Sequence, residues 1–340
     1  MADRLLEVKD LKVRFTTEDG VVRAVDGVDF ELDRSKVLGI VGESGSGKSV
    51  TALTLLGLTR AHNTSFSGQV LYKGRDLLGM PESGLRDVRG NEIAMIFQDP
   101  MTSLNPVYKV GDQIVEAIVA HEKVSKRIAR RRAIDLLRQV GFPRPEDRVD
   151  DYPHQFSGGM RQRAMIAMAL SCNPDILIAD EPTTALDVTI QAQILQLLDR
   201  LRADFDSAVI LITHDLGVVA GVTDDILVMY AGRVVERGSK EDVFYDPQMP
   251  YTWGLMGSIP RLDRPKPKQL HSIKGSPPSL ITLPPGCRFR PRCPHAFEKC
   301  HEEPELKSRV EDERHLDRCW LPVEEKRKVR EATISGEAAA

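Results

Sequence analysis

The stretch VLGIVGESGSGKS, residues 37–49, joins an apolar strand to a glycine-rich turn and ends in a Lys-Ser pair. The residues that follow, VTALTLLGL, have the apolar spacing of a helix. Glycines let successive backbone N–H groups point at phosphate oxygens, and the N-terminus of the helix adds positive potential. Lys48 can reach the β- and γ-phosphates of a nucleotide, and the Ser49 hydroxyl can bind Mg²⁺. An incidental glycine turn is the alternative, but the order of strand, loop, Lys-Ser and helix favours a phosphate loop.

Two acidic residues come at the end of ILIADE, residues 176–181, which predicts a buried strand. Ligands bind at the carboxyl ends of strands in open α/β sheets, so Asp180 and Glu181 are placed where a nucleotide is expected. Asp180 suits the Mg²⁺ shell, and Glu181 can polarise a water for in-line attack on the γ-phosphate. Alone, such a pair more often lies in a surface turn, but the phosphate loop upstream favours the catalytic interpretation.

The order of apolar segments predicts an α/β protein with a largely parallel central sheet, introduced by an antiparallel β portion. Alternation in residues 5–15 and 21–32 predicts the half-buried strands of that portion. Helical spacing dominates between about 99 and 160, in VGDQIVEAIVAHEK and KRIARRRAIDLLRQV, and predicts a helical subdomain. Further strands are expected in IAMIFQ, DILIADE, AVILITHD and DILVMYAG.

The composition of the chain changes after Gly238: the stretches PRLDRPKPKQL and GSPPSLITLPPG are rich in proline and lack hydrophobic periodicity. We therefore expect an ATPase domain at 1–238 and a C-terminal extension at 239–325. The last residues, 326–340, are expected to form a flexible tail. With 340 residues the chain is long enough for one large domain and a smaller appendage.

Bulk composition argues against a nucleic-acid partner, because 47 Lys and Arg residues are balanced by 50 Asp and Glu residues. The basic stretch KVSKRIARRR, residues 123–132, is interpreted as a solvated helix face rather than a nucleic-acid patch, since no aromatic residues are interleaved with it. The N-terminus MADRLLEVKD is charged where a signal peptide would be apolar, and no apolar run approaches the length of a membrane span. A cytoplasmic protein is expected, with membrane contact only through partners.

The stretch FSGGMRQR, Phe156 to Arg163, separates this chain from other proteins that have a phosphate loop. It resembles the signature of the ATP-binding cassette (ABC) family, which reads like LSGGQ and opens a helix. Other landmarks of that family follow in order: an aromatic residue, Phe15, that would stack on adenine, Gln98 after IAMIF, the ALD stretch ending at Asp187, and THD containing His214. The resemblance covers about residues 5–238. It implies an ABC-type nucleotide-binding domain with a phosphate-loop parallel core, an antiparallel β subdomain and a helical subdomain.

This resemblance also implies roles for the matching residues. Two cassettes dimerise head to tail, so the signature of one chain would close over the nucleotide of the other. Gln98 would sense Mg²⁺ and the γ-phosphate, and His214 would contact the γ-phosphate beside Glu181. Met160 replaces the usual glutamine of the signature and lacks its amide donors. The residues expected to bind ATP are Phe15, Gly42, Glu43, Ser44, Gly45, Ser46, Gly47, Lys48, Ser49, Val50, Gln98 and Asp180; those expected to act in trans are Ser157, Gly158, Gly159 and Met160.

The stretches YPHQFSGGMRQRAMIAMAL and QDPMTSLNPV resemble a narrower group, the ATPase subunits of oligopeptide, dipeptide and nickel importers. The GGM signature resembles the type that pairs with a paralogous GGQ-bearing ATPase, so a heterodimer is implied. Two membrane permeases and an extracytoplasmic solute-binding protein would complete the complex, with this chain at the cytoplasmic face of the membrane. Peptide cargo is expected, and nickel or another small solute is the alternative.

Four of the five cysteines lie near the C-terminus: Cys287, Cys293, Cys300 and Cys319. Disulfides are disfavoured in a reducing compartment, and clustering favours a metal site over unrelated thiols. No close C-x₂₋₄-C pair typical of zinc is present, and four thiolates also suit an iron–sulfur cluster. The peptide-importer group has a C-terminal region that resembles LPPGCRFRPRCP, and there a [4Fe–4S] cluster is implied. Zinc is the alternative, and His295 or His315 could replace one cysteine.

Two other classes of protein can be compared with the transporter ATPase. A soluble cassette that remodels nucleic acid or ribosomes usually has two cassettes or a long coiled-coil insertion, whereas this chain has one phosphate loop. An iron–sulfur electron carrier would leave the whole nucleotide machinery unexplained. The sequence therefore predicts an ATPase that uses MgATP, with a structural cluster in its extension favoured over a redox sensor.

Overall fold

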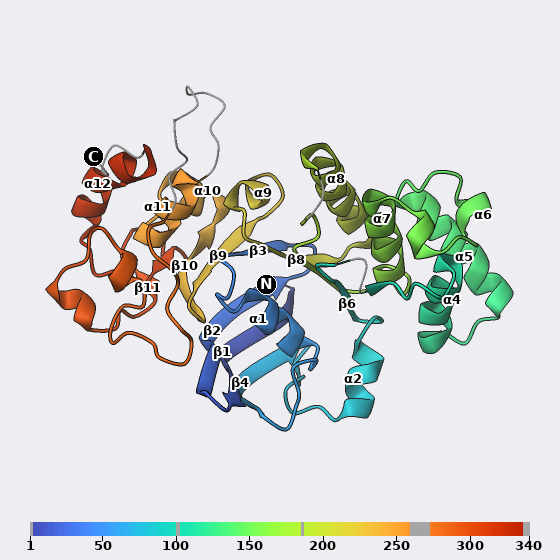
Figure 1. Ribbon diagram of the computed structural model, residues 1–340, viewed down its shortest axis with the longest axis horizontal. Coiled ribbons are helices and arrows are strands. Elements are labelled where there is room, and N and C mark those ends of the chain that lie inside the picture. The colour runs from blue at the N-terminus through green and yellow to red at the C-terminus, as the bar shows by residue number, and fades with distance from the viewer. Residues whose placement is uncertain (1–2, 100–102, 185–186, 259–272, 336–340) are drawn as a thin grey trace. The chain divides into compact units, whose positions relative to one another are not determined.

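The computed structural model describes residues 3–99, 103–184, 187–258 and 273–335, and Figure 1 shows them as a ribbon. The chain forms two compact units, and each unit draws on segments far apart in sequence. The first unit takes its described residues from Met1–Leu5, Leu32–Lys36 and Gly79–Ile212, and the second from Leu6–Glu31, Val37–Leu78 and Thr213–Ala340. Residues on both sides of the expected boundary at 238 therefore belong to one unit.

Three parallel strands form the sheet of the first unit, in the order β8-β7-β6. They are β6 (Ile93–Ile96), β7 (Ile176–Asp180) and β8 (Ala208–Thr213). Every residue of β7 and β8 is buried, which explains why their sequences are continuous apolar runs rather than alternating ones. All three strands lie where the apolar segments predict them.

Helices make up most of the rest of the first unit. Figure 1 shows α4 (Val110–His121), α5 (Lys126–Gln139) and α7 (Gly158–Ala169) packed together. The two helices that the sequence predicts are confirmed as α4 and α5, and Ser125 caps α5 by accepting a hydrogen bond from the Ile128 N–H. The remaining helical elements of this unit are α2 (Glu82–Val88), α6 (Pro145–Arg148), the 3₁₀ turn η1 (Pro153–Gln155) and α8 (Val188–Phe205).

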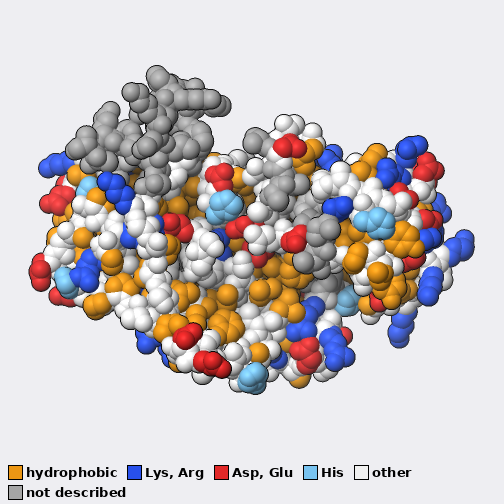
Figure 2. Space-filling view, in the orientation of Figure 1, with side chains coloured by type: hydrophobic (Ala, Val, Ile, Leu, Met, Phe, Trp, Pro, Cys, Tyr) orange, Lys and Arg blue, Asp and Glu red, His pale blue; other side chains and the backbone are white. Residues whose placement is uncertain are grey.

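Two arginines of the basic stretch in the first unit are paired with acids. Arg130 of α5 bonds to Asp150, and Arg132 bonds to Glu122 at 2.5 Å. Figure 2 shows Lys and Arg side chains over this helical region interspersed with Asp and Glu side chains. The arrangement is that of a solvated helix surface with ion pairs, as the sequence predicts.

The second unit contains an antiparallel sheet in the order β2-β1-β4-β5. Its strands are β1 (Arg4–Thr17), β2 (Gly20–Asp33), β4 (Thr64–Tyr72) and β5 (Arg75–Asp76). The register of β1 against β4 places Phe15 opposite Thr64. This sheet confirms the antiparallel β portion that the alternating residues predict.

A second set of strands in this unit runs in the order β11-β12-β10-β9-β3. Strand β3 (Val37–Val41) pairs in parallel with β9 (Asp225–Tyr230), and β9 pairs antiparallel with β10 (Arg233–Ser239). From the C-terminal part of the chain, β12 (Leu316–Asp317) pairs with β10, and β11 (Lys307–Ser308) pairs with β12. The C-terminal segment thus continues the edge of the sheet that contains β3.

The helices of the second unit are short except at the end of the chain. They are α1 (Lys48–Leu55), α9 (Leu216–Ala220), α10 (Lys240–Tyr245), α11 (Pro250–Gly257), the turns η2 (Arg290–Arg292) and η3 (Glu298–His301), and α12 (Val323–Ser335). Residues 326–335 of the expected tail lie in α12, which packs against α11, and residues 336–340 lie outside the described residues. Lys326 of α12 is fully buried and bonds at 2.9 Å to Asp317, which lies nine residues earlier and outside the helix.

Candidate functional site

The phosphate loop connects the end of β3 to the start of α1 in the second unit. Gly42, Gly45 and Gly47 all have positive φ angles, the region that favours glycine. A Cβ atom at Gly42 would lie 2.1 Å from the Met229 carbonyl oxygen, and one at Gly47 would lie 2.4 Å from that of Ala24. Only glycine fits at these two positions, so the spacing in the sequence reflects a close approach of backbone to backbone.

Two buried side chains of this loop carry groups that can bind a polyanion. Lys48 is 5% exposed, and its Nζ donates to the carbonyl oxygens of Gly42 at 2.7 Å and Glu43 at 3.0 Å. The buried hydroxyl of Ser46 has no hydrogen-bond partner among the described residues. A buried ammonium group and a buried unpaired hydroxyl at a helix N-terminus fit the phosphates of a nucleotide.

In the first unit, Glu181 follows directly on β7 and has a φ angle of 45°. Its N–H donates to the Ile212 carbonyl at 2.9 Å. Its Oε2 accepts hydrogen bonds from Gln98 Nε2 and from Thr184 Oγ1, both at 2.9 Å. A non-glycine residue in this backbone region is strained, and such strain is concentrated at functional sites. The structure thus brings together Gln98 and Glu181, and adds Thr184, which the sequence analysis missed because its hydroxyl has no motif of its own.

Asp180 is 5% exposed, whereas Gln98 is exposed and Glu181 is intermediate. The buried carboxylate comes from the last residue of β7, and the carboxylate of Glu181 lies nearer solvent. Adjacent acids at a strand end therefore have different environments, one suited to holding a cation and one to contacting water.

The signature residues lie at the N-terminus of α7. Ser157 caps this helix, since its Oγ accepts from the Met160 N–H at 3.4 Å, and both Ser157 and Gly158 are exposed. Phe156 is buried and packs on Phe142 with ring centroids 4.9 Å apart, which anchors the start of the helix. An exposed helix N-terminus with its cap in place presents N–H donors to solvent.

The remaining predicted residues are divided between the units. Asp187 caps α8 through a 3.0 Å bond from the Ile190 N–H, while residues 185–186 of the ALD stretch lie outside the described residues. In the second unit, Phe15 is half-buried on β1 and His214 is exposed directly after β8. Val50 lies in the first turn of α1.

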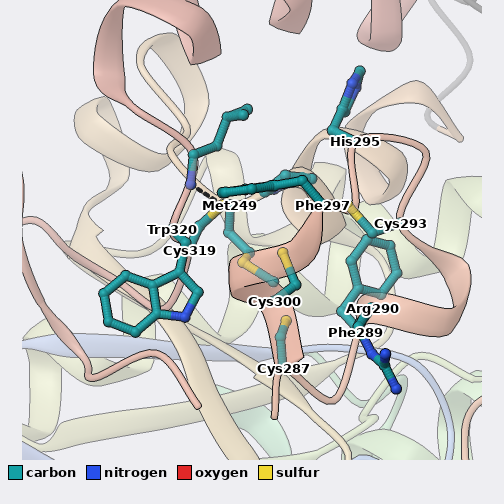
Figure 3. Close-up of a pocket in the computed structure, with 12 residues that line it drawn as sticks. Met249, Cys287, Phe289, Arg290, Cys293, His295, Phe297, Cys300, Cys319 and Trp320 are labelled. Carbon is teal, nitrogen blue, oxygen red and sulfur yellow. Dashed lines mark hydrogen bonds between the residues drawn. The ribbon is translucent and has the colours of Figure 1, made fainter. Parts of the chain in front are cut away.

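All four C-terminal cysteines line a single pocket (Figure 3). The pocket is otherwise largely apolar, with Met249, Phe289, Phe297 and Trp320 among its walls. His295 also lines it, whereas His315 lies elsewhere and its Nε2 is 2.9 Å from Glu236. Cys172 is buried in the first unit, where its Sγ lies 3.7 Å from the Ala117 carbonyl oxygen. The structure therefore gathers the four thiols that the sequence groups together.

Short turns hold these cysteines in place. The Cys287 N–H donates to the Cys300 carbonyl at 3.0 Å, and the turn η2 leads directly into Cys293. Burial raises the pKa of Cys287, and raises those of Cys293 and Cys319 to about 12. These three thiols are therefore protonated at neutral pH, so a metal centre would have to displace their protons. Within the described part of the chain, no group of three or more His, Cys, Asp or Glu residues is arranged to hold a metal ion.

A buried ion-pair cluster attaches the segment from Cys287 to Cys319, here called the cysteine segment, to strands β2 and β10. Arg288 bonds to Asp26 of β2, and its other nitrogen donates to the Ala231 carbonyl at 2.5 Å. Arg233 of β10 bonds to the same Asp26 oxygen at 3.0 Å. Burial opposes ionisation of Asp26, but the hydrogen bonds from both arginines hold its pKa below the ordinary value. The cluster joins residues 262 positions apart, which explains why the sequence does not indicate it.

The fold and the two nucleotide elements define an ATP-binding cassette ATPase. The family described as ABC transporter matches residues 25–184, and the family described as oligopeptide/dipeptide transporter, C-terminal region, matches residues 235–300. The oligopeptide transport ATP-binding protein OppD of Escherichia coli strain K12 is 53% identical over 95% of both chains, and the dipeptide transport ATP-binding protein DppD of Bacillus subtilis strain 168 is 50% identical over 99% of both. The chain therefore belongs to the family of ATP-binding proteins of oligopeptide and dipeptide transporters.

Similarity to solved structures agrees with this assignment. The dimeric structure of the bacterial ABC transporter cassette MJ0796 matches with a TM-score of 0.62 at 26% identity, over 69% of this chain and 99% of the other. No helix in the described residues is long and apolar enough to cross a membrane.

Proposed function

We propose that this chain is the ATPase subunit that energises peptide uptake by a membrane transport complex. The observation that carries the proposal is Glu181, held at the end of β7 by Gln98 and Thr184, in a chain that also has a complete phosphate loop. Relatives 50–53% identical over nearly the whole chain are oligopeptide and dipeptide transport proteins, which favours peptides over nickel as cargo. No feature of the described residues favours nucleic acid.

Hydrolysis follows from the chemistry of the side chains. In the second unit, the phosphate-loop N–H groups and Lys48 would bind the β- and γ-phosphates, and Ser49 would supply an oxygen ligand for Mg²⁺. In the first unit, Gln98 and Asp180 are the residues that would supply further oxygen ligands. Glu181 accepts a hydrogen bond from the attacking water and polarises it, and His214 donates to the γ-phosphate. Water attacks the γ-phosphorus as the bond to the bridging oxygen of ADP breaks, which gives ADP and phosphate.

A second ATPase completes the site. The exposed Ser157 and Gly158 at the start of α7 offer a hydroxyl and N–H donors for a nucleotide bound to another subunit, and Gly159 and Met160 continue this surface. We assign that subunit to a paralogous GGQ-type ATPase, with Asp187 at the same interface. Two permeases and an extracytoplasmic solute-binding protein complete the complex, and this chain lies at the cytoplasmic face of the membrane.

Uptake by the reconstituted complex tests the function. The chain, its paralogous ATPase, the permeases and the binding protein would be placed in vesicles and given labelled tripeptide or nickel with ATP. We expect ATP-dependent accumulation of the tripeptide and none of nickel. Accumulation of nickel alone would contradict the peptide assignment, and accumulation of neither solute while ATP is hydrolysed would contradict the transport role.

We further propose that residues 239–325 form an extension in which Cys287, Cys293, Cys300 and Cys319 hold a [4Fe–4S] cluster. The proposal is supported by the pocket that all four thiols line. Four thiolates suit a [4Fe–4S] cluster, and zinc is the alternative. When bound, the cluster would supply folding energy to a segment with few helices or strands of its own.

Metal analysis after anaerobic purification separates these possibilities. We expect iron and acid-labile sulfide in equal amounts, close to four per chain, together with visible absorption. The Cys300→Ser variant should lose most of both, whereas Cys172→Ser, which removes a buried thiol of the first unit, should retain them. Zinc without sulfide would replace the cluster with a single-metal site, and retention of iron by Cys300→Ser would exclude that thiol as a ligand.

A further inference from the structure

The turn that carries two of the pocket cysteines also reaches the phosphate loop. Arg292, in η2 between Cys287 and Cys293, bonds to both carboxylate oxygens of Glu43, at 2.5 and 3.0 Å. The Arg292 side chain is 4% exposed and that of Glu43 is 27% exposed. Because Glu43 follows the first glycine of the loop, the C-terminal segment touches the nucleotide site of its own chain.

A second contact holds the same loop residue. The Glu43 N–H donates to the hydroxyl oxygen of Tyr251 in α11 at 2.8 Å. The Tyr251 ring is fully buried against Tyr230 and Phe289, with centroids 4.6 and 5.4 Å away, and Phe289 is itself part of the cysteine pocket. Burial raises the pKa of Tyr251, so its hydroxyl remains neutral. Glu43 is thus fixed through both its side chain and its backbone.

The Arg292 contact matters because it neutralises the negative charge of Glu43 next to the expected phosphates. Glu43 places a carboxylate inside a loop whose expected ligand is a polyanion, and its backbone carbonyl also accepts from Lys48 at 3.0 Å. An unpaired carboxylate here would repel the phosphates and compete for the lysine. The forked guanidinium of Arg292 satisfies both carboxylate oxygens at once, which a flexible ammonium does less well.

We propose that Arg292 is a positioning residue for the nucleotide site: it neutralises Glu43 and holds the phosphate loop in the conformation that binds MgATP. The cysteine segment therefore contributes to ATP binding in cis. This inference rests on the proposed ATPase function, but it concerns a residue outside all the cassette motifs.

Calorimetric titration of the purified full-length chain with MgATP tests the proposal. We expect Arg292→Met to raise the dissociation constant about tenfold, as the loss of a charge-assisted pair does. Arg292→Met also loses bonds to the carbonyls of Ile273 and Lys274. A higher dissociation constant in this single variant therefore does not by itself show that the charge on Glu43 is the cause. The decisive variant combines Arg292→Met with Glu43→Gln, which removes the uncompensated carboxylate. This double variant should bind MgATP within about threefold of the unmodified chain.

Arg330→Met is the matched control, because Arg330 forms a partly buried ion pair with Asp246 within the same unit. It should leave the dissociation constant unchanged, and thermal unfolding would verify that each variant is folded. The inference is overturned if Arg292→Met binds MgATP as tightly as the unmodified chain, or if Glu43→Gln gives no rescue. Whether the unmodified chain binds MgATP at all tests the proposed function separately. The inference about Arg292 depends only on the ratio of the dissociation constants of the variant and the unmodified chain.

Discussion

Replacing Glu181 with glutamine is expected to lower the kcat for ATP hydrolysis by about 10²- to 10⁴-fold, the usual contribution of a positioned general base. The amide keeps the size of the side chain and one hydrogen-bonding oxygen for Gln98 and Thr184, so the local structure should survive. It cannot accept a proton from the attacking water. Steady-state phosphate release by the transport complex gives kcat, and MgATP binding should change by no more than about threefold, because the loss belongs to the chemical step.

Asp175→Asn is the matched control for this prediction. Asp175 immediately precedes β7, so it lies at the opposite end of the strand from Glu181, and it pairs with Arg34 at 3.3 Å. Its substitution should leave kcat within about twofold, because an exposed or partly exposed ion pair contributes little. A fall of less than tenfold in Glu181→Gln would contradict the assignment of this residue as the group that polarises the attacking water.

Replacing Lys48 with methionine is expected to reduce kcat by about 10²- to 10³-fold, as loss of one preorganised donor to a developing charge does. It should also weaken MgATP binding at least tenfold, because the ammonium group is buried and is expected to contact the phosphates before reaction. Methionine has a similar length and leaves the carbonyls of Gly42 and Glu43 without their donor. Phosphate release and calorimetric titration measure the two effects on the same preparation.

Lys36→Met provides the comparison for Lys48→Met. Lys36 directly precedes β3, the strand that ends at the phosphate loop, and its side chain is exposed. Both kinetic and binding constants should be unchanged within about twofold. Equal losses in the two variants would indicate a general effect of removing a lysine, and unaltered binding in Lys48→Met would contradict its contact with the phosphates.

Local patterns were sufficient for most of the secondary structure. Runs such as ILIAD and AVILIT form strands because every residue in them is buried, and amphipathic spacing locates α4 and α5. Local patterns did not predict the C-terminal helix. The sequence of α12 is highly charged, which is not typical of a packed helix. Lys326 is nevertheless buried, because Asp317, which lies outside the helix, compensates its charge.

The candidate site likewise combines features that local sequence predicts with contacts between residues far apart in the chain. The phosphate loop can be identified from sequence, because its glycine conformations and its lysine are determined within a few consecutive residues. The bond from Gln98 to Glu181 spans 83 residues, and the pair of Arg292 with Glu43 spans 249. The first was expected only through the resemblance to a family, and the second had no pattern to indicate it.

From the residues alone it was possible to predict the central strands, the phosphate loop, the acidic pair after β7 and the grouping of four cysteines, because each depends on neighbouring residues or on a short fixed spacing. Tertiary structure alone decided that the four thiols share an apolar pocket, that α12 is anchored through a buried lysine, and that Arg292 meets the phosphate loop. These contacts join chain segments that are distant in sequence, and the energy of a buried ion pair is set by the environment that folding creates rather than by the identity of the residues.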